Sequence, residues 1–195
     1  MRHAITILLA LPLAGCISFG AEPPPSLLTL ETREQVPVGE VRRATEGQAV
    51  TIASLSAPQA LATTRVPVQQ APGSIAYVEE AQWSEPPTRL FARLLGDTVA
   101  ARTGRPVLNG GAPVADPGTT VGGELRRFGL DATTREAVVT FDAQLARSDG
   151  AAVERRRFEA RVPVAGEIEA TTVGPLLNDA ANQVAVQVAD WIGRG

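Results

Sequence analysis

Two segments of the chain carry hydrophobic residues at the three- and four-residue spacing of an amphipathic helix, residues 87–102 and residues 171–192. Ser84 or Glu85 can cap the first helix ahead of two prolines, and Gly104 ends it. Pro175 marks the start of the second. The apolar stripes expected to face a common core are Leu90, Phe91, Leu94, Leu95 and Thr98 in the first helix and Leu177, Ala181, Val184, Val188 and Trp191 in the second.

Alternating or β-branched apolar runs predict strands in the rest of the chain. Short strands are expected at residues 27–30, 49–55, 65–69 and 74–78, and longer ones at 119–130, 136–147 and 152–162. Ala71-Pro72-Gly73 predicts a turn between the strands at 65–69 and 74–78, and residues 109–117 are expected to form a loop. Turns at Asp131–Thr134 and at Ser148-Asp149-Gly150 make the three long strands a meander. The predicted fold class is α+β, a mainly antiparallel sheet with two amphipathic helices packed on one face.

The N-terminus has the layout of a secretory signal peptide. Arg2 and His3 precede an apolar run at residues 4–13, which is too short to cross a bilayer as a helix of ~20 residues. Small residues then lead into Cys16, and Leu13-Ala14-Gly15-Cys16 matches the bacterial lipobox. The chain thus resembles a lipoprotein precursor.

The lipoprotein resemblance implies cleavage between Gly15 and Cys16 and lipidation of Cys16, with two or three acyl chains as a stable membrane anchor. The alternative is a buried segment with an incidental cysteine. The expected organisation is a signal peptide at residues 1–15, a lipidated N-terminus and Pro-rich spacer at 16–26, and one domain at 27–195. Ile17 directly follows Cys16, where an aspartate would resemble the inner-membrane retention signal of enterobacterial lipoproteins, so the resemblance favours the outer membrane.

The composition limits the chemistry of the mature chain. The single histidine, His3, would leave with the signal peptide, and the single cysteine, Cys16, would carry the lipid. The mature chain is therefore not expected to contain a disulfide, or a catalytic or metal site built on histidine or thiolate, and no cofactor is predicted. Beyond residue 15 there are 17 arginines, no lysine and 21 acidic residues, a net charge of −4 that does not suggest nucleic-acid binding. A carboxylate-based hydrolase remains an alternative, with Glu79, Glu80, Glu85 and Asp97 as candidate acids. The simpler interpretation is that these four residues form a solvated, charged rim.

Arginines cluster in the last predicted strand. Arg155, Arg157 and Arg161 share one side of it, because side chains alternate along a strand. One interpretation is a solvent face on which these arginines pair with Glu159 and neighbouring carboxylates. The other is a docking face for an acidic partner subunit or phospholipid headgroups, since the guanidinium group binds carboxylate and phosphate in bidentate fashion.

Tyr77, Trp83 and Glu85-Pro86, followed by the amphipathic helix, give the middle of the chain a specific pattern. With the lipobox, the meander and the closing helix, this order resembles the ABC-type transport auxiliary lipoprotein family, which includes the lipoprotein of the paraquat-inducible envelope system and partners of mammalian-cell-entry (MCE) lipid transporters. Ala76-Tyr77-Val78 departs from the common pattern, which leaves Tyr77 without an assigned role.

The resemblance implies a non-enzymatic, periplasm-facing lipoprotein of the outer membrane. It would serve a transport system that moves phospholipids or hydrophobic compounds between the membranes. Its expected partners are the permease or MCE-domain subunits of that system, and further copies of the same lipoprotein in a homo-oligomer. The alternative is a structural or assembly-factor envelope lipoprotein without a transport role.

Overall fold

The computed structural model describes residues 26–43, 45, 47–109, 118–147 and 152–194. The predicted signal peptide, the cleavage site at Gly15 and the lipidation site at Cys16 lie outside the described residues. So do the predicted turn Ser148-Asp149-Gly150 and most of the predicted loop at 109–117.

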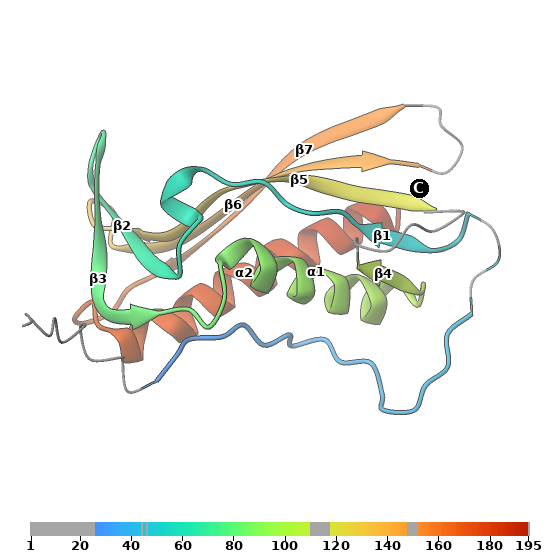
Figure 1. Cartoon of the computed structure of the whole chain (residues 1–195), viewed down its shortest axis with the longest axis horizontal. Helices are drawn as coiled ribbons and strands as arrows, with labels where there is room; N and C mark the ends of the chain where they lie inside the picture. The colour runs from blue at the N-terminus through green and yellow to red at the C-terminus, as the bar shows by residue number, and fades with distance from the viewer. Residues whose placement is uncertain (1–25, 44, 46, 110–117, 148–151, 195) are drawn as a thin grey trace, which may run out of the picture.

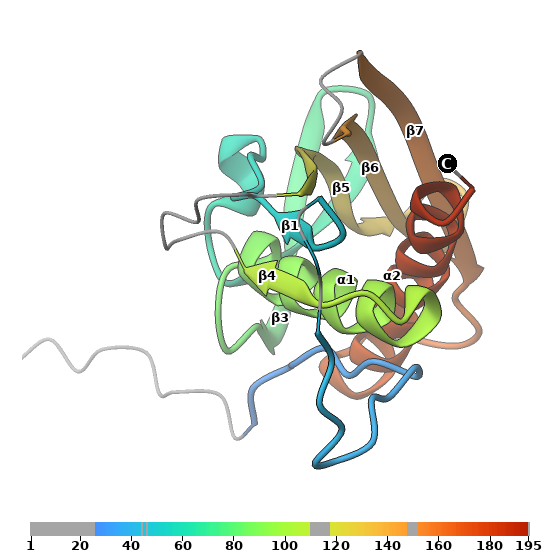
Figure 2. The same ribbon diagram turned by 90° about the vertical axis from the view of Figure 1, so that its right-hand side faces the viewer.

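A seven-stranded sheet and two α-helices make up the described part of the chain, with one short 3-10 helix, η1. The elements are β1 (Val50–Ile52), η1 (Gln59–Leu61), β2 (Arg65–Ala71), β3 (Ser74–Gln82), α1 (Pro87–Thr103), β4 (Val107–Asn109), β5 (Thr119–Asp131), β6 (Glu136–Ala146), β7 (Val153–Pro163) and α2 (Ala170–Ile192). Both helices lie on the same side of the sheet (Figures 1 and 2). The predicted α+β fold is confirmed.

The sheet is mixed, with long antiparallel ladders and short parallel pairings. β5, β6 and β7 form the predicted meander, and β2 and β3 form the predicted hairpin. In contrast, β1 pairs in parallel with both β4 and β5, and β2 pairs in parallel with the end of β5. The short strand β4 lies next to the predicted loop and was not expected, because three residues are too few to show an alternating pattern.

A bulge in β5 adjusts which residues face the helices. The register with β6 shifts between Leu125 and Arg127, so Leu125 and Phe128 are both buried although three positions separate them. Immediately after the bulge, Gly129 lies against Pro67 of β2, and a Cβ atom there would come within 2.3 Å of the Pro67 carbonyl oxygen. Only glycine allows β2 to approach β5 this closely.

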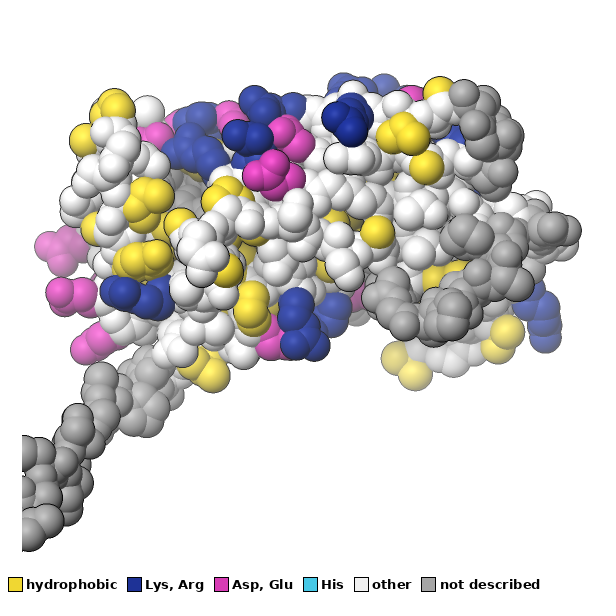
Figure 3. All heavy atoms as spheres, turned by 45° about the horizontal axis from the view of Figure 1, so that its top comes forward, with side chains coloured by type: hydrophobic (Ala, Val, Ile, Leu, Met, Phe, Trp, Pro, Cys, Tyr) yellow, Lys and Arg dark blue, Asp and Glu magenta, His cyan; other side chains and the backbone are white. Residues whose placement is uncertain are grey.

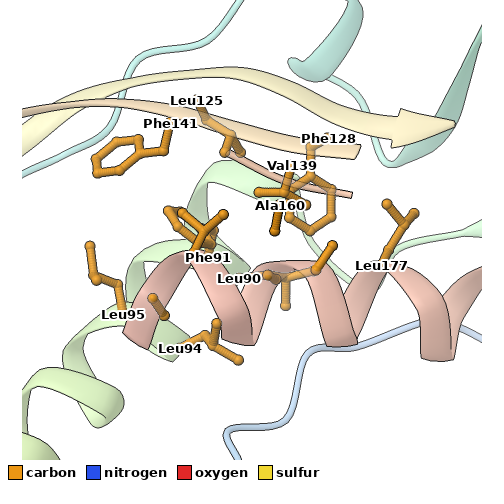
Figure 4. Close-up of a cluster of buried hydrophobic side chains, with 14 of the residues drawn as sticks. Leu90, Phe91, Leu94, Leu95, Leu125, Phe128, Val139, Phe141, Ala160 and Leu177 are labelled. Carbon is orange, nitrogen blue, oxygen red and sulfur yellow. The ribbon is translucent and has the colours of Figure 1, made fainter. Parts of the chain in front are cut away.

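The core lies between the sheet and the two helices. Figure 4 shows α1 side chains meeting Leu125, Phe128, Val139 and Phe141 of the sheet. The predicted stripes are confirmed, because every residue in both of them is buried. Trp191 at the end of α2 packs on Phe158 of β7, with ring centroids 5.5 Å apart.

Both helices begin within one residue of their predicted bounds, at Pro87 and Ala170, but the residues assigned to start them need correction. α2 begins at Ala170, five residues before Pro175, because Glu169 and Thr172 form a reciprocal capping box there. Pro175 is exposed within the second turn, where water can satisfy the carbonyl that loses its donor. At α1 the N-cap is Pro86, which makes no side-chain cap, and Glu85 instead pairs with arginines of α1.

The predicted strand at residues 27–30 is also wrong, since Leu28 alone forms a bridge, to Trp83. Residues 26–43, here called the strap, cross the helices on the side away from the sheet (Figure 1). Two asparagine side chains of α2 hold the strap backbone. Asn178 Oδ1 accepts a hydrogen bond from the backbone N–H of Glu31, and Asn182 Oδ1 accepts one from the backbone N–H of Arg33, both at 2.9 Å. Asn182 lies outside the predicted apolar stripe of α2, yet it is buried where the strap covers it.

The buried stripe of α1 should dominate the contribution of this helix to stability. Leu94 is 2% exposed, so Leu94→Ala should lower the free energy of unfolding by ~2–5 kcal/mol through the cavity it leaves. Arg93→Ala removes an exposed ion pair with Glu85 and should lower the free energy of unfolding much less than Leu94→Ala does. Guanidinium denaturation in detergent, followed by tryptophan fluorescence, measures both; equal losses would contradict the assignment of the two faces.

Candidate functional site

The predicted arginines of β7 lie on the face of β5, β6 and β7 that points away from the helices, here called the outer face. Arg155, Arg157 and Arg161 alternate with Phe158 and Ala160, which are buried beneath the sheet. Figure 3 shows basic and acidic side chains mixed on this side of the molecule, with hydrophobic side chains gathered toward the β2–β3 hairpin. The outer face is therefore charged in both signs.

Arg157 forms a bidentate pair with Asp142 of the neighbouring strand. Its Nε and Nη2 atoms donate to the two carboxylate oxygens at 2.6 and 2.7 Å. This hydrogen bonding lowers the pKa of Asp142, and the positive charge of Arg126, 3.6 Å from the same carboxylate, contributes to the shift. Asp142 therefore remains an anion that holds the Arg157 guanidinium in a fixed orientation.

Arg161 bridges two carboxylates. It lies 2.9 Å from Glu136 of β6 and 2.7 Å from Glu159 of its own strand. Its hydrogen bond to Glu136 lowers the pKa of that carboxyl group. Glu159 also accepts a hydrogen bond from Thr140 at 2.7 Å. The structure thus brings Arg157 and Arg161 into ion pairs within the chain, as the solvent-face interpretation expects.

Arg155 differs from the other two arginines. It is exposed, and its register partner on β6 is the neutral Gln144. Within the part of the chain that the structure describes, it makes no ion pair. Arg155 therefore offers an uncompensated guanidinium beside two arginines whose positions are fixed by carboxylates.

An apolar hollow of about 160 Å³ adjoins the charged area. Leu61 of η1, Pro67 of β2 and Ile75 of β3 line it, together with Arg126 and Arg127 of β5. The hollow has room for one large side chain, and Arg127 is held by Asp131 at 3.0 Å. The sequence did not reveal this feature, because its lining comes from four elements that only the tertiary fold brings together.

The structure does not assemble a carboxylate pair from the candidate acids at Glu85 and Asp97. These residues are separated by about three helical turns. A hydrogen bond from Arg93 lowers the pKa of Glu85, whereas burial of the carboxyl group raises the pKa of Asp97. Glu79 and Glu80 are exposed neighbours on β3, at a bulge where Glu80 has a φ of 57°. A lowered pKa in Glu85 is opposite to what a general acid requires.

Two further properties of the described residues bear on function. Among them, no group of three acidic, histidine or cysteine side chains is placed to hold a metal ion. Neither α1 nor α2 is long and apolar enough to cross a membrane.

Comparison with solved structures identifies proteins of the same fold. Protein XCC0632 from Xanthomonas campestris superposes with a TM-score of 0.66 at 19% sequence identity, over 86% of this chain and 94% of that one. The crystal structure of an uncharacterised protein gives a TM-score of 0.60 at 12% identity, over 79% of this chain and 95% of that one. No curated protein sequence shows significant similarity to the chain.

Sequence comparison agrees with the fold and also identifies a protein family. The profile of the ABC-type transport auxiliary lipoprotein component family matches residues 29–189, which extends from the strap to the last turns of α2. The family resemblance seen in Tyr77, Trp83 and Glu85-Pro86 is therefore confirmed. The chain belongs to the ABC-type transport auxiliary lipoprotein component family.

Proposed function

We propose that this protein is an outer-membrane lipoprotein, anchored through Cys16, that serves an MCE-type ABC system moving phospholipids or hydrophobic compounds between the membranes. The observation that carries the proposal is the family match over residues 29–189, directly after a lipobox and a proline-containing spacer. The family is defined as an auxiliary component of transport and not as an enzyme class. The protein would recruit or position a transporter subunit instead of performing chemistry.

The outer face is the surface we assign to that partner. Fixed ion pairs at Arg157 and Arg161 display guanidinium and carboxylate groups in set positions, and Arg155 adds a positive charge that no described residue pairs with. Such a pattern complements a partner surface that carries carboxylates opposite Arg155. Because Arg157 and Arg161 are already oriented, docking would have to order only Arg155 among these arginines, which limits the loss of side-chain entropy. The adjoining hollow can receive one apolar side chain of the same partner.

The anchor is tested at Cys16. Cys16→Ser should abolish acylation and move the protein from the membrane fraction to the soluble fraction, because the thiol is the atom that the lipid modifies. Cell fractionation and intact-mass measurement follow the two effects. A Cys16→Ser protein that keeps both its membrane association and the lipid mass would contradict the anchor.

The docking face is tested by changing Arg155, Arg157 and Arg161 together to Gln. The lost pairs are largely exposed and therefore contribute little to stability, so the melting temperature should change little. Binding to the permease or MCE-domain subunit of the cognate transport system should fall, most strongly at low salt, where charge attraction is least screened.

The matched control removes three exposed arginines from the helix side by changing Arg33, Arg89 and Arg93 to Gln. It makes the same change in net charge and should keep full binding. Undiminished binding of the outer-face variant at both low and moderate salt would rule out this docking face. If the lipoprotein instead co-purifies with an outer-membrane assembly complex and without any transporter subunit, the assembly-factor alternative is correct.

A further inference from the structure

The strap exposes large hydrophobic side chains on the side of the molecule opposite the sheet. Among the described residues, five large hydrophobic side chains are exposed, and three of them belong to the strap: Leu27, Val38 and Val41. The other two are on β3 and β7. Isolated exposed hydrophobic residues are ordinary, but their concentration in one short segment is not.

Val38 and Val41 lie at a turn that the chain holds in place. The Glu40 amide donates to the Pro37 carbonyl at 3.2 Å, and Gly39 has a φ of 85°, so residues 37–40 form a β-turn of type II. Val38 is at the first corner of this turn and fully exposed, and Val41 is 71% exposed. Proline, glycine and small polar residues normally occupy the corners of such turns. Here the turn presents valine to its surroundings.

Arg42 fixes the base of this turn on α1. Its guanidinium donates to the Ala100 carbonyl and to Glu40, the second at 2.8 Å. Arg43 is exposed and makes no ion pair within the described residues. In Figures 1 and 2 the turn projects away from the sheet, on the side of the helices where the strap begins. Residues 37–43 are here called the tip.

The strap also decides where the lipid anchor joins the domain. The Leu28 amide donates to the Gln82 carbonyl at 2.7 Å, and its side chain packs so closely on α2 that a Cβ at Gly174 would meet it at 2.8 Å. The chain from Cys16 to Ser26 spans at most about 40 Å. That reach alone would allow several orientations of the domain, and a second contact with the bilayer would select one of them.

We propose that the tip is a membrane-contacting element that holds the strap side of the domain against the bilayer surface. Val38 and Val41 enter the headgroup and acyl boundary, and Arg43 meets lipid phosphates, the arrangement that interfacial segments use. This orientation leaves the outer face of the sheet directed into the periplasm. The inference rests on the Cys16 anchor of the proposed function.

The test uses the lipidated protein in vesicles of phosphatidylethanolamine with a minority of phosphatidylglycerol. Acylation consumes Cys16, so a cysteine introduced at Val38→Cys or Val41→Cys is the single free thiol and can carry a bimane fluorophore. The matched control is Ile75→Cys, a half-exposed hydrophobic position on β3 at the apolar hollow. Nitroxide-bearing lipids should quench the tip labels severalfold more than the Ile75 label.

A charge in the tip separates true insertion from an affinity of the dye for lipid. Val41→Asp should remove most of the quenching at position 38, whereas Ala62→Asp, at an exposed position beside η1, should not. Equal quenching at 38 and 75 in acylated, vesicle-bound protein overturns the tip and leaves the anchor intact. Protein without lipid mass that does not float with the vesicles overturns the anchor, and the tip proposal with it.

Discussion

A chain of four buried aromatic rings joins the parts of this molecule. Trp83, directly after β3, meets Phe128 of β5 edge to face with centroids 5.3 Å apart. Phe128 lies 6.5 Å from Phe91 of α1, which in turn meets Phe141 of β6 at 5.3 Å. Each such pair contributes ~0.5–1.5 kcal/mol beyond the apolar area that it buries. Because Trp83 also bridges Leu28, the same cluster fixes the start of the strap.

This packing divides the surface into two sides with different properties. On the strap side, backbone groups are held by Asn178 and Asn182, and the hydrophobic tip projects away from the core. On the outer face, arginines and carboxylates form ordered pairs around the bulge in β5. A lipid anchor entering on the first side and a protein partner docking on the second would be compatible, because the whole thickness of the domain separates them.

The sequence predicts the periodic parts of the fold well. Both helices, the β2–β3 hairpin and the long meander follow from spacing and turn residues, because each buries a regular stripe on one core. The failures have local physical causes. The run at 27–30 is apolar because Leu28 packs on α2, and Pro175 is tolerated on an exposed turn of a helix that Glu169 had already capped.

The candidate sites likewise contain some features that the sequence predicts and others that only the tertiary fold creates. Alternation along one strand was enough to place Arg155, Arg157 and Arg161 on one side, but Asp142 and Glu136 become their partners only through the register of β6. The apolar hollow depends on four segments, and the role of Asn182 depends on the strap covering it. Features that require distant segments to meet had no periodic signal in the sequence.

Hydrogen–deuterium exchange of the lipidated protein in nanodiscs, with and without the transporter subunit, tests the two-sided arrangement most directly. The account predicts that the bilayer slows exchange of the tip amides at residues 38–43, and that the partner slows exchange along β7 from Glu154 to Arg161. The two protected regions should not overlap. Protection of the strap by the partner, or of β7 by the bilayer alone, would contradict it.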